Sequence, residues 1–223
     1  MRKNWDAVLF DFDGTLVDSA PDIIAALNRL LDEIGHDAVH YDTYRTRAGD
    51  GARKLLTETL IDQGTCFKEA ELPVLVDRLL DHYYGLMTEK TRLYQGVPEV
   101  LEEIYNSGMA LAVCTNRTSK TTKYLLSHFG LTKLFSAVVC ADNVSAKKPD
   151  AAHLQEAIKS LSTAPERTVM IGDTATDVAA ARNAGIKVVV VSYGYSVRPA
   201  HDLGADAVLD DFSQLPALLK VFR

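Results

Sequence analysis

Cysteine is scarce in this chain of 223 residues, and its three copies, Cys66, Cys114 and Cys140, are odd in number. A small secreted domain held by disulfides would carry an even, closely spaced set, so we expect free thiols and a reducing compartment. The chain also lacks an apolar run near the roughly 20 residues that a membrane helix needs, and its start lacks a signal-peptide core. These absences favour a cytoplasmic protein that does not enter a membrane.

Runs of basic residues are missing too. The chain contains 24 Lys and Arg residues and 30 Asp and Glu residues, for a net charge of −6. This balance argues against a nucleic-acid partner. No glycine-rich phosphate loop ending in Lys-Ser or Lys-Thr is present, no cysteine is followed six positions later by arginine, and the six histidines lack metal-ligand spacing. Hydrophobic residues nevertheless make up 47% of the chain, which is typical of a folded globular protein.

Short apolar runs alternate with amphipathic stretches along most of the chain. Their shortness and bulk predict fully buried parallel strands. Proline at the start and glycine just past the end of the intervening stretches are typical of helices. Alternation of this kind predicts an α/β fold with a Rossmann-like parallel sheet. The expected strands are residues 7–10, 109–114, 137–140, 168–171, 187–191 and 207–209.

One long segment interrupts this alternation. Residues 19–91 contain helical stripes of Ile, Leu and Val but no strong strand, and we expect Ser19 to cap the first of these helices. The sequence therefore predicts an α/β core domain made of residues 1–18 and 92–223, with a helical domain, residues 19–91, inserted after the first strand.

Polar side chains follow the predicted strands where a parallel sheet binds its ligands. Asp11 and Asp13 come directly after the first strand, and Gly14 permits a tight turn behind them. Two carboxylates held close together repel each other unless one stays protonated or a cation lies between them, and Mg²⁺ prefers such oxygen ligands. Asp173 follows a later strand and could add a ligand, while Asp177 could bind the metal or orient a ligand from behind it.

Three further side chains could bind an anion at the same edge. Thr115 and Asn116 follow the strand at 109–114 with a hydroxyl and an amide. Lys148 precedes Pro149 at the start of a helix, where a fixed ammonium would stabilise negative charge on a transferred group. For each of these residues, turn formation or a solvated surface position is the alternative interpretation.

These segments resemble the four motifs of the haloacid dehalogenase-like superfamily, in the family's order. The segment at 11–19 reads DFDGTLVDS, Thr115-Asn116 and Lys148-Pro149 follow, and the segment at 172–177 reads GDTATD. The inserted helices stand where this family carries a helical cap domain. Within the superfamily, the segments AGDGARKLL (48–56), KKPD (147–150) and SYGY (192–195) are similar to bacterial phosphoglycolate phosphatases.

This resemblance implies an Mg²⁺-dependent hydrolase that cleaves a small phosphorylated metabolite through an aspartyl-phosphate. Asp11 would be the nucleophile and Asp13 the general acid and base. The metal would be held by Asp11, the backbone carbonyl of Asp13, and Asp173. The phosphoryl oxygens would be bound by Thr115, Asn116 and Lys148.

The resemblance favours 2-phosphoglycolate as the substrate, which would be hydrolysed to glycolate and phosphate. Arg53 and Lys54 in the inserted helices could meet its carboxylate, although a solvated helix face is the alternative. A sugar-phosphate mutase similar to β-phosphoglucomutase, a pyrophosphatase on the same scaffold and a non-catalytic binding protein stay open as alternatives. Dehalogenation is disfavoured, because a halide leaves without the proton that an acid such as Asp13 supplies.

Overall fold

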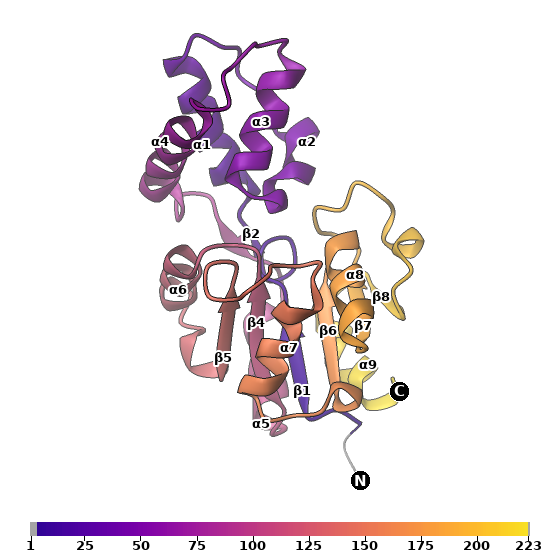
Figure 1. Cartoon of the computed structure of the whole chain (residues 1–223). Helices are drawn as coiled ribbons and strands as arrows, with labels where there is room; N and C mark the ends of the chain where they lie inside the picture. The colour runs from indigo at the N-terminus through magenta and orange to yellow at the C-terminus, as the bar shows by residue number, and fades with distance from the viewer. Residues whose placement is uncertain (1–3, 223) are drawn as a thin grey trace. The chain divides into compact units, whose positions relative to one another are not determined.

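The computed structural model describes residues 4–222, which form two compact units (Figure 1). The first, which we call the core unit, combines the residues up to Val17 with those from Leu93 onward. The second, which we call the helical unit, is Asp18–Arg92. Each unit buries apolar clusters of its own, as expected of segments that fold around separate cores.

The core unit is built on a sheet of six parallel strands in the order β5-β4-β1-β6-β7-β8 (Figure 1). Its strands are β1 (Ala7–Phe10), β4 (Ala110–Thr115), β5 (Ala137–Cys140), β6 (Thr168–Gly172), β7 (Lys187–Val191) and β8 (Ala207–Leu209). The predicted α/β fold with a parallel sheet is confirmed. In register, Phe10 of β1 lies beside Val113 of β4 and Ile171 of β6, so the carboxyl ends of these three strands are neighbours.

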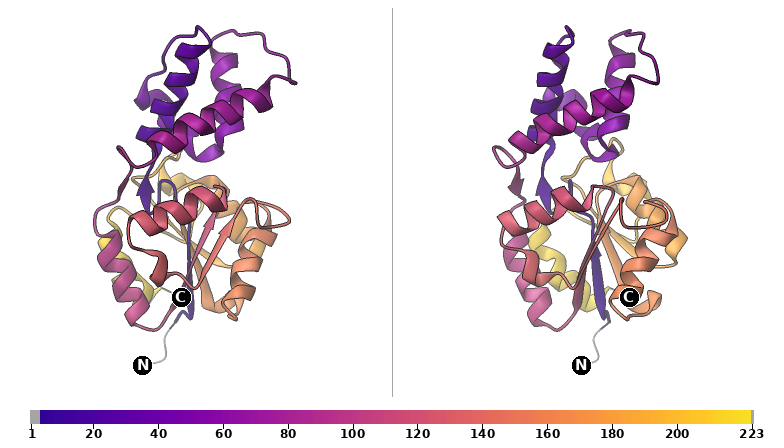
Figure 2. Two further views of the ribbon diagram at one scale, coloured as in Figure 1. Left: turned by 90° about the vertical axis from the view of Figure 1, so that its left-hand side faces the viewer. Right: turned by 60° about the vertical axis from the view of Figure 1, so that its left-hand side comes forward.

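Helices cover both faces of this sheet, because its strands are apolar on both sides (Figure 2). Phe10 packs into a cluster with residues of α5, α6 and α9, whereas its neighbour Leu9 packs into a cluster with residues of α7 and α8. The helices are α5 (Val97–Asn106), α6 (Ser119–His128), α7 (Ala151–Ser160), α8 (Ala175–Ala184) and α9 (Leu215–Val221). Among residues 4–222, no helix has the length and apolar character needed to cross a bilayer.

Two strands end one residue later than hydrophobicity predicts. β4 runs to Thr115 and β6 to Gly172, because their backbones pair with Cys140 and Val190 on neighbouring strands. An apolar pattern stops at the last apolar side chain, whereas a hydrogen-bonded ladder continues through polar residues and glycine. Thr115 is therefore part of the rigid sheet rather than of the loop that follows it.

The helical unit contains α1 (Ala20–Glu33), α2 (Tyr41–Tyr44), α3 (Ala52–Asp62) and α4 (Leu72–Leu86), with a 3₁₀ turn at Arg45–Asp50 (Figure 2). The helical stripes predicted from the sequence correspond to α1, α3 and α4. The short α2 and the 3₁₀ turn were not predicted, because four to six residues are too few for a helical period to be recognised. Two short strands, β2 (Val17–Asp18) and β3 (Arg92–Leu93), were missed for the same reason and form a two-stranded sheet.

The two ends of the helical unit are joined by the buried carboxylate of Asp22. It accepts hydrogen bonds from the backbone N–H of Lys90 (3.0 Å) and from the N–H and hydroxyl of Thr91 (2.8 Å each). Ser19 occupies the N-cap position of α1, as predicted, but its side chain makes no cap hydrogen bond. Its backbone is already helical (φ −99°, ψ −11°), whereas a capping residue needs an extended backbone.

Candidate active site

The first candidate residue lies where β1 leaves the sheet. The backbone N–H of Asp11 donates to Ile171 O (2.9 Å), which continues the pairing with β6 for one more residue. A tight turn follows, in which Gly14 has a φ of +80° and its N–H donates to Val17 O (2.8 Å). Few residues other than glycine adopt that backbone conformation easily. The sheet therefore fixes the backbone position of Asp11, and Gly14 turns the chain away from it.

Three carboxylates from three elements come together at this edge of the sheet. Asp11 follows β1, Asp173 follows β6 and Asp177 lies in the first turn of α8, and each contributes an oxygen to a cluster whose members lie within 4.8 Å of one another. Asp173 and Asp177 are fully buried, whereas the Asp11 side chain is 13% exposed. We call these three side chains the acidic cluster. Of its members, Asp11 is the one that solvent and a ligand can reach.

The ammonium of Lys148 lies against the acidic cluster. Its Nζ is 2.9 Å from Asp11 Oδ1 and 2.6 Å from Asp177 Oδ1, and its side chain is 2% exposed. Burial disfavours a charged lysine, but the two carboxylates outweigh burial and hold the pKa of Lys148 above its ordinary value. The sequence alternative of a solvated surface lysine is therefore wrong for Lys148.

One ammonium cannot balance three carboxylates, and the pKa values of the acids differ accordingly. Burial, together with the charge of Asp177, raises the pKa of Asp11 to about 7, although Lys148 opposes that shift. Burial and its two carboxylate neighbours raise the pKa of Asp173 well above its usual range. Burial also tends to raise the pKa of Asp177. The Lys148 ammonium and the hydrogen bonds from Thr174 outweigh burial and hold that pKa below its ordinary value. Without a bound cation, the acidic cluster thus relieves part of its negative charge by holding protons on Asp11 and Asp173 at a higher pH than ordinary carboxyl groups do.

We expect the Lys148→Met variant to unfold more easily at pH 8 without divalent ions. Removing one partner of a buried ion pair leaves an uncompensated charge, which costs about 3–5 kcal/mol of the free energy of unfolding. At pH 5 the loss should shrink, because the raised pKa values of Asp11 and Asp173 let both acids take up protons there. Urea denaturation at both pH values measures this, with Lys147→Met, a change at the exposed neighbouring lysine, as the control.

The carboxylate of Asp173 is held from two sides. Its Oδ1 accepts from the Thr15 hydroxyl (3.0 Å) and its Oδ2 from the backbone N–H of Tyr195 (2.7 Å). A Cβ at Gly14 would lie 2.2 Å from Asp173 Oδ2, and one at Gly194 would lie 2.3 Å from Asp173 Cβ. Neither position therefore has room for a side chain. Because both residues are glycine, their backbone can pass close to the Asp173 carboxylate. The sequence analysis noted the SYGY segment for its resemblance only and missed this role.

Asp177 makes two sets of contacts with its two oxygens. Oδ1 accepts from Lys148, whereas Oδ2 accepts from the backbone N–H of Asp173 (3.2 Å) and from the N–H (3.0 Å) and hydroxyl (2.7 Å) of Thr174. The hydrogen bond from the Thr174 N–H to the Asp177 carboxylate is one half of a capping box at the start of α8. This arrangement favours the sequence interpretation in which Asp177 orients its neighbours from behind them.

Asp13 is not a member of the acidic cluster and has a partner of its own. Both of its oxygens accept hydrogen bonds from the Arg117 guanidinium, at 2.9 Å from Nε and 2.5 Å from the terminal nitrogen. The carboxylates grouped with Asp11 in the structure are those of Asp173 and Asp177, whereas the Asp13 carboxylate pairs with Arg117, so a metal contact from Asp13 stays a prediction. The local sequence pattern carries no signal for this pairing, because Arg117 and Asp13 are 104 positions apart.

Thr115 and Asn116 lie beside this group, since Thr115 is the last residue of β4 and Asn116 follows it. The buried Thr115 hydroxyl accepts from the backbone N–H of Arg117 (3.2 Å). The Asn116 amide donates one hydrogen bond to the backbone carbonyl of Lys148 (3.0 Å). Each side chain retains a donor hydrogen, since a hydroxyl has one and an amide has two.

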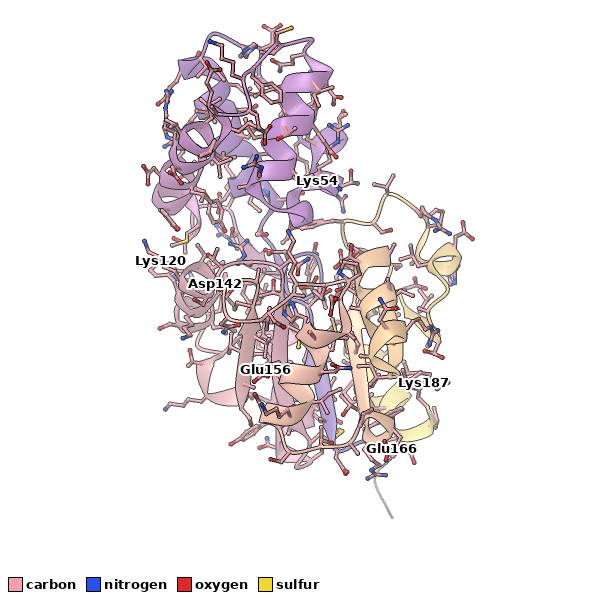
Figure 3. All side chains as sticks on the ribbon, viewed as in Figure 1. Lys54, Lys120, Asp142, Glu156, Glu166 and Lys187 are labelled. Atoms are coloured by element: carbon pink, nitrogen blue, oxygen red, sulfur yellow. The ribbon has the colours of Figure 1, made fainter. Side chains whose placement is uncertain are left out.

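The polar residues that follow β5 stabilise the fold and do not join the acidic cluster. Asp142, labelled in Figure 3 near the carboxyl end of β5, accepts from the N–H and hydroxyl of Ser119 (2.8 Å each) at the start of α6. Asn143 accepts from the backbone N–H of Cys140 (2.7 Å). Both side chains thus act as turn and cap residues, so a polar residue after a strand does not by itself identify a catalytic group.

Arg53 and Lys54 belong to the helical unit, on α3. Lys54 is labelled in Figure 3. Arg53 forms an ion pair with Glu69, and Lys54 lies 3.8 Å from Glu58, one helical turn along. Both basic side chains are more than half exposed, and surface pairs of this kind add little stability. The solvated helix face weighed in the sequence analysis describes their surroundings within this unit.

Comparison with known proteins agrees with these motifs. Residues 8–191 match the family described as haloacid dehalogenase-like hydrolase. The phosphoglycolate phosphatase of Agrobacterium fabrum is 38% identical over 213 residues, covering 95% of this chain and 91% of that protein. The enzyme of the same name from Caulobacter vibrioides is also 38% identical, covering 96% of this chain and 90% of that protein.

Solved structures extend the similarity to the fold. A predicted phosphoglycolate phosphatase from Haemophilus somnus superposes with a TM-score of 0.92 at 27% identity, covering 98% of this chain and 99% of that one. CbbY from Rhodobacter sphaeroides, solved in complex with phosphate, has a TM-score of 0.80 at 25% identity and covers 95% of this chain and 96% of its own. Both matches span the core unit and the inserted helices.

Proposed function

Because this chain belongs to the haloacid dehalogenase-like hydrolase family, we propose that it hydrolyses 2-phosphoglycolate to glycolate and phosphate. The observation that carries the proposal is Asp11, the accessible carboxylate of the acidic cluster, whose Oδ1 lies 2.9 Å from the Lys148 ammonium. A carboxylate nucleophile beside a fixed cation suits attack on a phosphoryl group, whose negative charge the cation offsets. The named relatives at 38% identity support the choice of ester.

The acidic cluster also supports a bound divalent cation, which we propose to be Mg²⁺. Its oxygen donors are of the hard kind that Mg²⁺ prefers, and its negative charge exceeds what Lys148 neutralises. The ion would be held by the carboxylates of Asp11 and Asp173 and by the backbone carbonyl of Asp13. When bound, it would offset the repulsion between the Asp11 carboxylate and a phosphate dianion.

In the first half-reaction, an Asp11 oxygen forms a bond to phosphorus while the bond from phosphorus to the ester oxygen breaks. Asp13, in its protonated form, gives its proton to the departing oxygen of glycolate, a poor leaving group without that proton. Lys148 and the donor hydrogens of Thr115 and Asn116 bind the phosphoryl oxygens. The product on the protein is an aspartyl-phosphate at Asp11.

In the second half-reaction, Asp13 takes a proton from a water molecule as the water attacks phosphorus. The bond between phosphorus and the Asp11 oxygen breaks, which restores the carboxylate and releases phosphate. Asp13, now protonated, is ready for the next turnover. Both oxygens of Asp13 accept from Arg117 in the structure, so the donating step requires this pair to open.

The helical unit, Asp18–Arg92, is proposed to act as the cap domain that the sequence predicts over residues 19–91, and to select the substrate. Arg53 and Lys54 stay a prediction as ligands of the substrate carboxylate. Their partners Glu69 and Glu58 would have to be displaced, which exposed ion pairs permit at small cost. We place the reaction in the cytoplasm, an assignment supported by the free thiols of Cys66, Cys114 and Cys140.

Phosphate release from a panel of esters, with and without a chelator, tests this function. The panel includes 2-phosphoglycolate, sugar phosphates and pyrophosphate, and we expect the highest kcat/KM on 2-phosphoglycolate and loss of activity with the chelator. Isomerisation of a sugar phosphate without net release would support a mutase instead. Preference for pyrophosphate would support a pyrophosphatase, and silence towards all compounds would support a binding protein.

Magnesium should stabilise the fold more strongly as pH rises from 5 to 8. Asp11 and Asp173 have raised pKa values, so the folded protein must lose protons to bind the ion at low pH. At a free ion concentration 100 times its Kd, stabilisation is about 2.7 kcal/mol, which is a shift of roughly 5–10 °C for a chain of this size. Thermal unfolding with and without Mg²⁺ at each pH measures the difference, and an equal shift at pH 5 and pH 8 would contradict the assignment of the ion to these acids.

A further inference from the structure

One buried histidine next to the active site has no part in the mechanism above. His153 lies in the first turn of α7 and is fully buried. It follows Lys148 by five residues, and it packs where α7 meets β5. A buried imidazole needs partners for both ring nitrogens, and here both have one.

The two partners of the ring determine where its proton resides. Nδ1 lies 3.2 Å from the backbone N of Lys148, which can only donate a hydrogen bond. Nε2 lies 3.1 Å from the backbone O of Val139 in β5, which can only accept one. His153 is therefore a neutral imidazole with its proton on Nε2 and its lone pair on Nδ1.

The electrostatic surroundings agree with this geometry. Burial, and secondarily the charge of Lys148, lowers the pKa of His153 to about 4. The same ring could not serve both partners if it were charged, because an imidazolium has no lone pair for the Lys148 N–H.

Lys148 is consequently held on both sides of its backbone. Its N–H donates to His153, and its carbonyl accepts from the Asn116 amide (3.0 Å). Its side chain then reaches Asp11 and Asp177. The peptide bond that follows, to Pro149, is cis.

We propose that His153 is a positioning residue, whose Nδ1 holds the Lys148 backbone and thereby aims the ammonium at Asp11. Its effect on turnover rests on the proposed function, since Lys148 acts there on the phosphoryl group. Small displacements of such a group reduce the rate strongly, because stabilisation of the transition state depends on distance and direction.

Two substitutions separate the two hydrogen bonds of the ring. Asparagine places an amide oxygen near the position of Nδ1 and can still accept from Lys148, whereas glutamine places an amide nitrogen near Nε2 and can still donate to Val139. We expect His153→Asn to keep kcat within about threefold, and His153→Gln to lower kcat roughly 10- to 100-fold with little change in KM. His201→Gln, at an exposed histidine, is the matched control and should leave kcat unchanged.

The folded stability of each variant has to be measured beside its activity. If kcat in the two His153 variants falls equally, or simply follows their melting temperatures, the residue only fills space and the proposal fails. A kcat for His153→Gln close to that of the unmodified protein would overturn it as well.

The ring proton can be observed without any turnover. Long-range ¹H–¹⁵N spectra of the histidine rings at pH 7.5, assigned with His153→Asn, should show His153 as the neutral Nε2–H form. A proton on Nδ1, or a charged ring, would overturn the proposal. If the unmodified protein released phosphate from no ester, the proposed function would fail, and this spectrum would still decide whether His153 holds Lys148.

Discussion

Replacing Asp11 with asparagine is expected to abolish phosphate release while leaving the fold intact. The amide keeps the shape of the side chain but cannot attack phosphorus, and loss of a covalent nucleophile lowers kcat by about 10⁴-fold or more. Steady-state hydrolysis of 2-phosphoglycolate and of an aryl phosphate measures the loss, which should be complete on both substrates. Asp142→Asn makes the same chemical change at the end of β5, where the side chain caps α6, and should keep full activity.

The same variant should also be more stable than the unmodified protein in the absence of divalent ions. Because the pKa of Asp11 is about 7 in the folded state and its ordinary value is 3.8, the folded protein binds more protons than the unfolded chain between these pH values. Stability of the unmodified protein therefore falls as pH rises through that window, and asparagine removes this contribution. Thermal unfolding should show a gap between the two proteins that grows from pH 5 to pH 8.

Retained turnover in Asp11→Asn would contradict the assignment of the nucleophile. A difference in melting temperature between Asp11→Asn and the unmodified protein that stays constant with pH would not affect the assignment of Asp11 as the nucleophile. It would contradict only the account of the acidic cluster, in which burial and the neighbouring carboxylates raise the pKa of Asp11.

Replacing Asp13 with asparagine should reduce the hydrolysis of alkyl phosphates far more than that of activated aryl phosphates. General acid catalysis contributes roughly 10²- to 10⁴-fold, and an aryl oxide leaves without the help of that proton. The ratio of kcat/KM on 2-phosphoglycolate to that on p-nitrophenyl phosphate should therefore fall by about the same factor. An equal loss on both substrates would argue against the acid role.

Arg117→Gln provides the control for this experiment, because asparagine at position 13 also disturbs the ion pair with Arg117. That variant removes the guanidinium contacts at 2.9 Å and 2.5 Å but keeps the carboxylate of Asp13. We expect it to leave the preference between alkyl and aryl esters in place. If it reproduced the leaving-group pattern of Asp13→Asn, the ion pair rather than proton transfer would explain that pattern.

Most of the fold could be predicted because its pattern is local. Short apolar runs identified every strand of the six-stranded sheet. The family predicted from four motifs is confirmed by the match over residues 8–191. The prediction of a hydrolase that resembles phosphoglycolate phosphatases is confirmed as well. The pairing of Asp13 with Arg117 could not be predicted in this way, since nothing in the local pattern connects residues that are 104 positions apart.

The sequence by itself determined which residue types stand at the carboxyl ends of three strands, because an apolar run there ends at a polar side chain: Asp11, Thr115 and Asp173. It also showed Lys148 before the proline that precedes a helix. The tertiary structure alone decided how these groups share charge. It brings the carboxylates of Asp11, Asp173 and Asp177 together. It also pairs Asp13 with Arg117 and places His153 where it accepts a hydrogen bond from the Lys148 backbone. The physical reason is that electrostatic energy depends on distances across strands and helices, whereas hydrophobic periodicity records only which side of an element is buried.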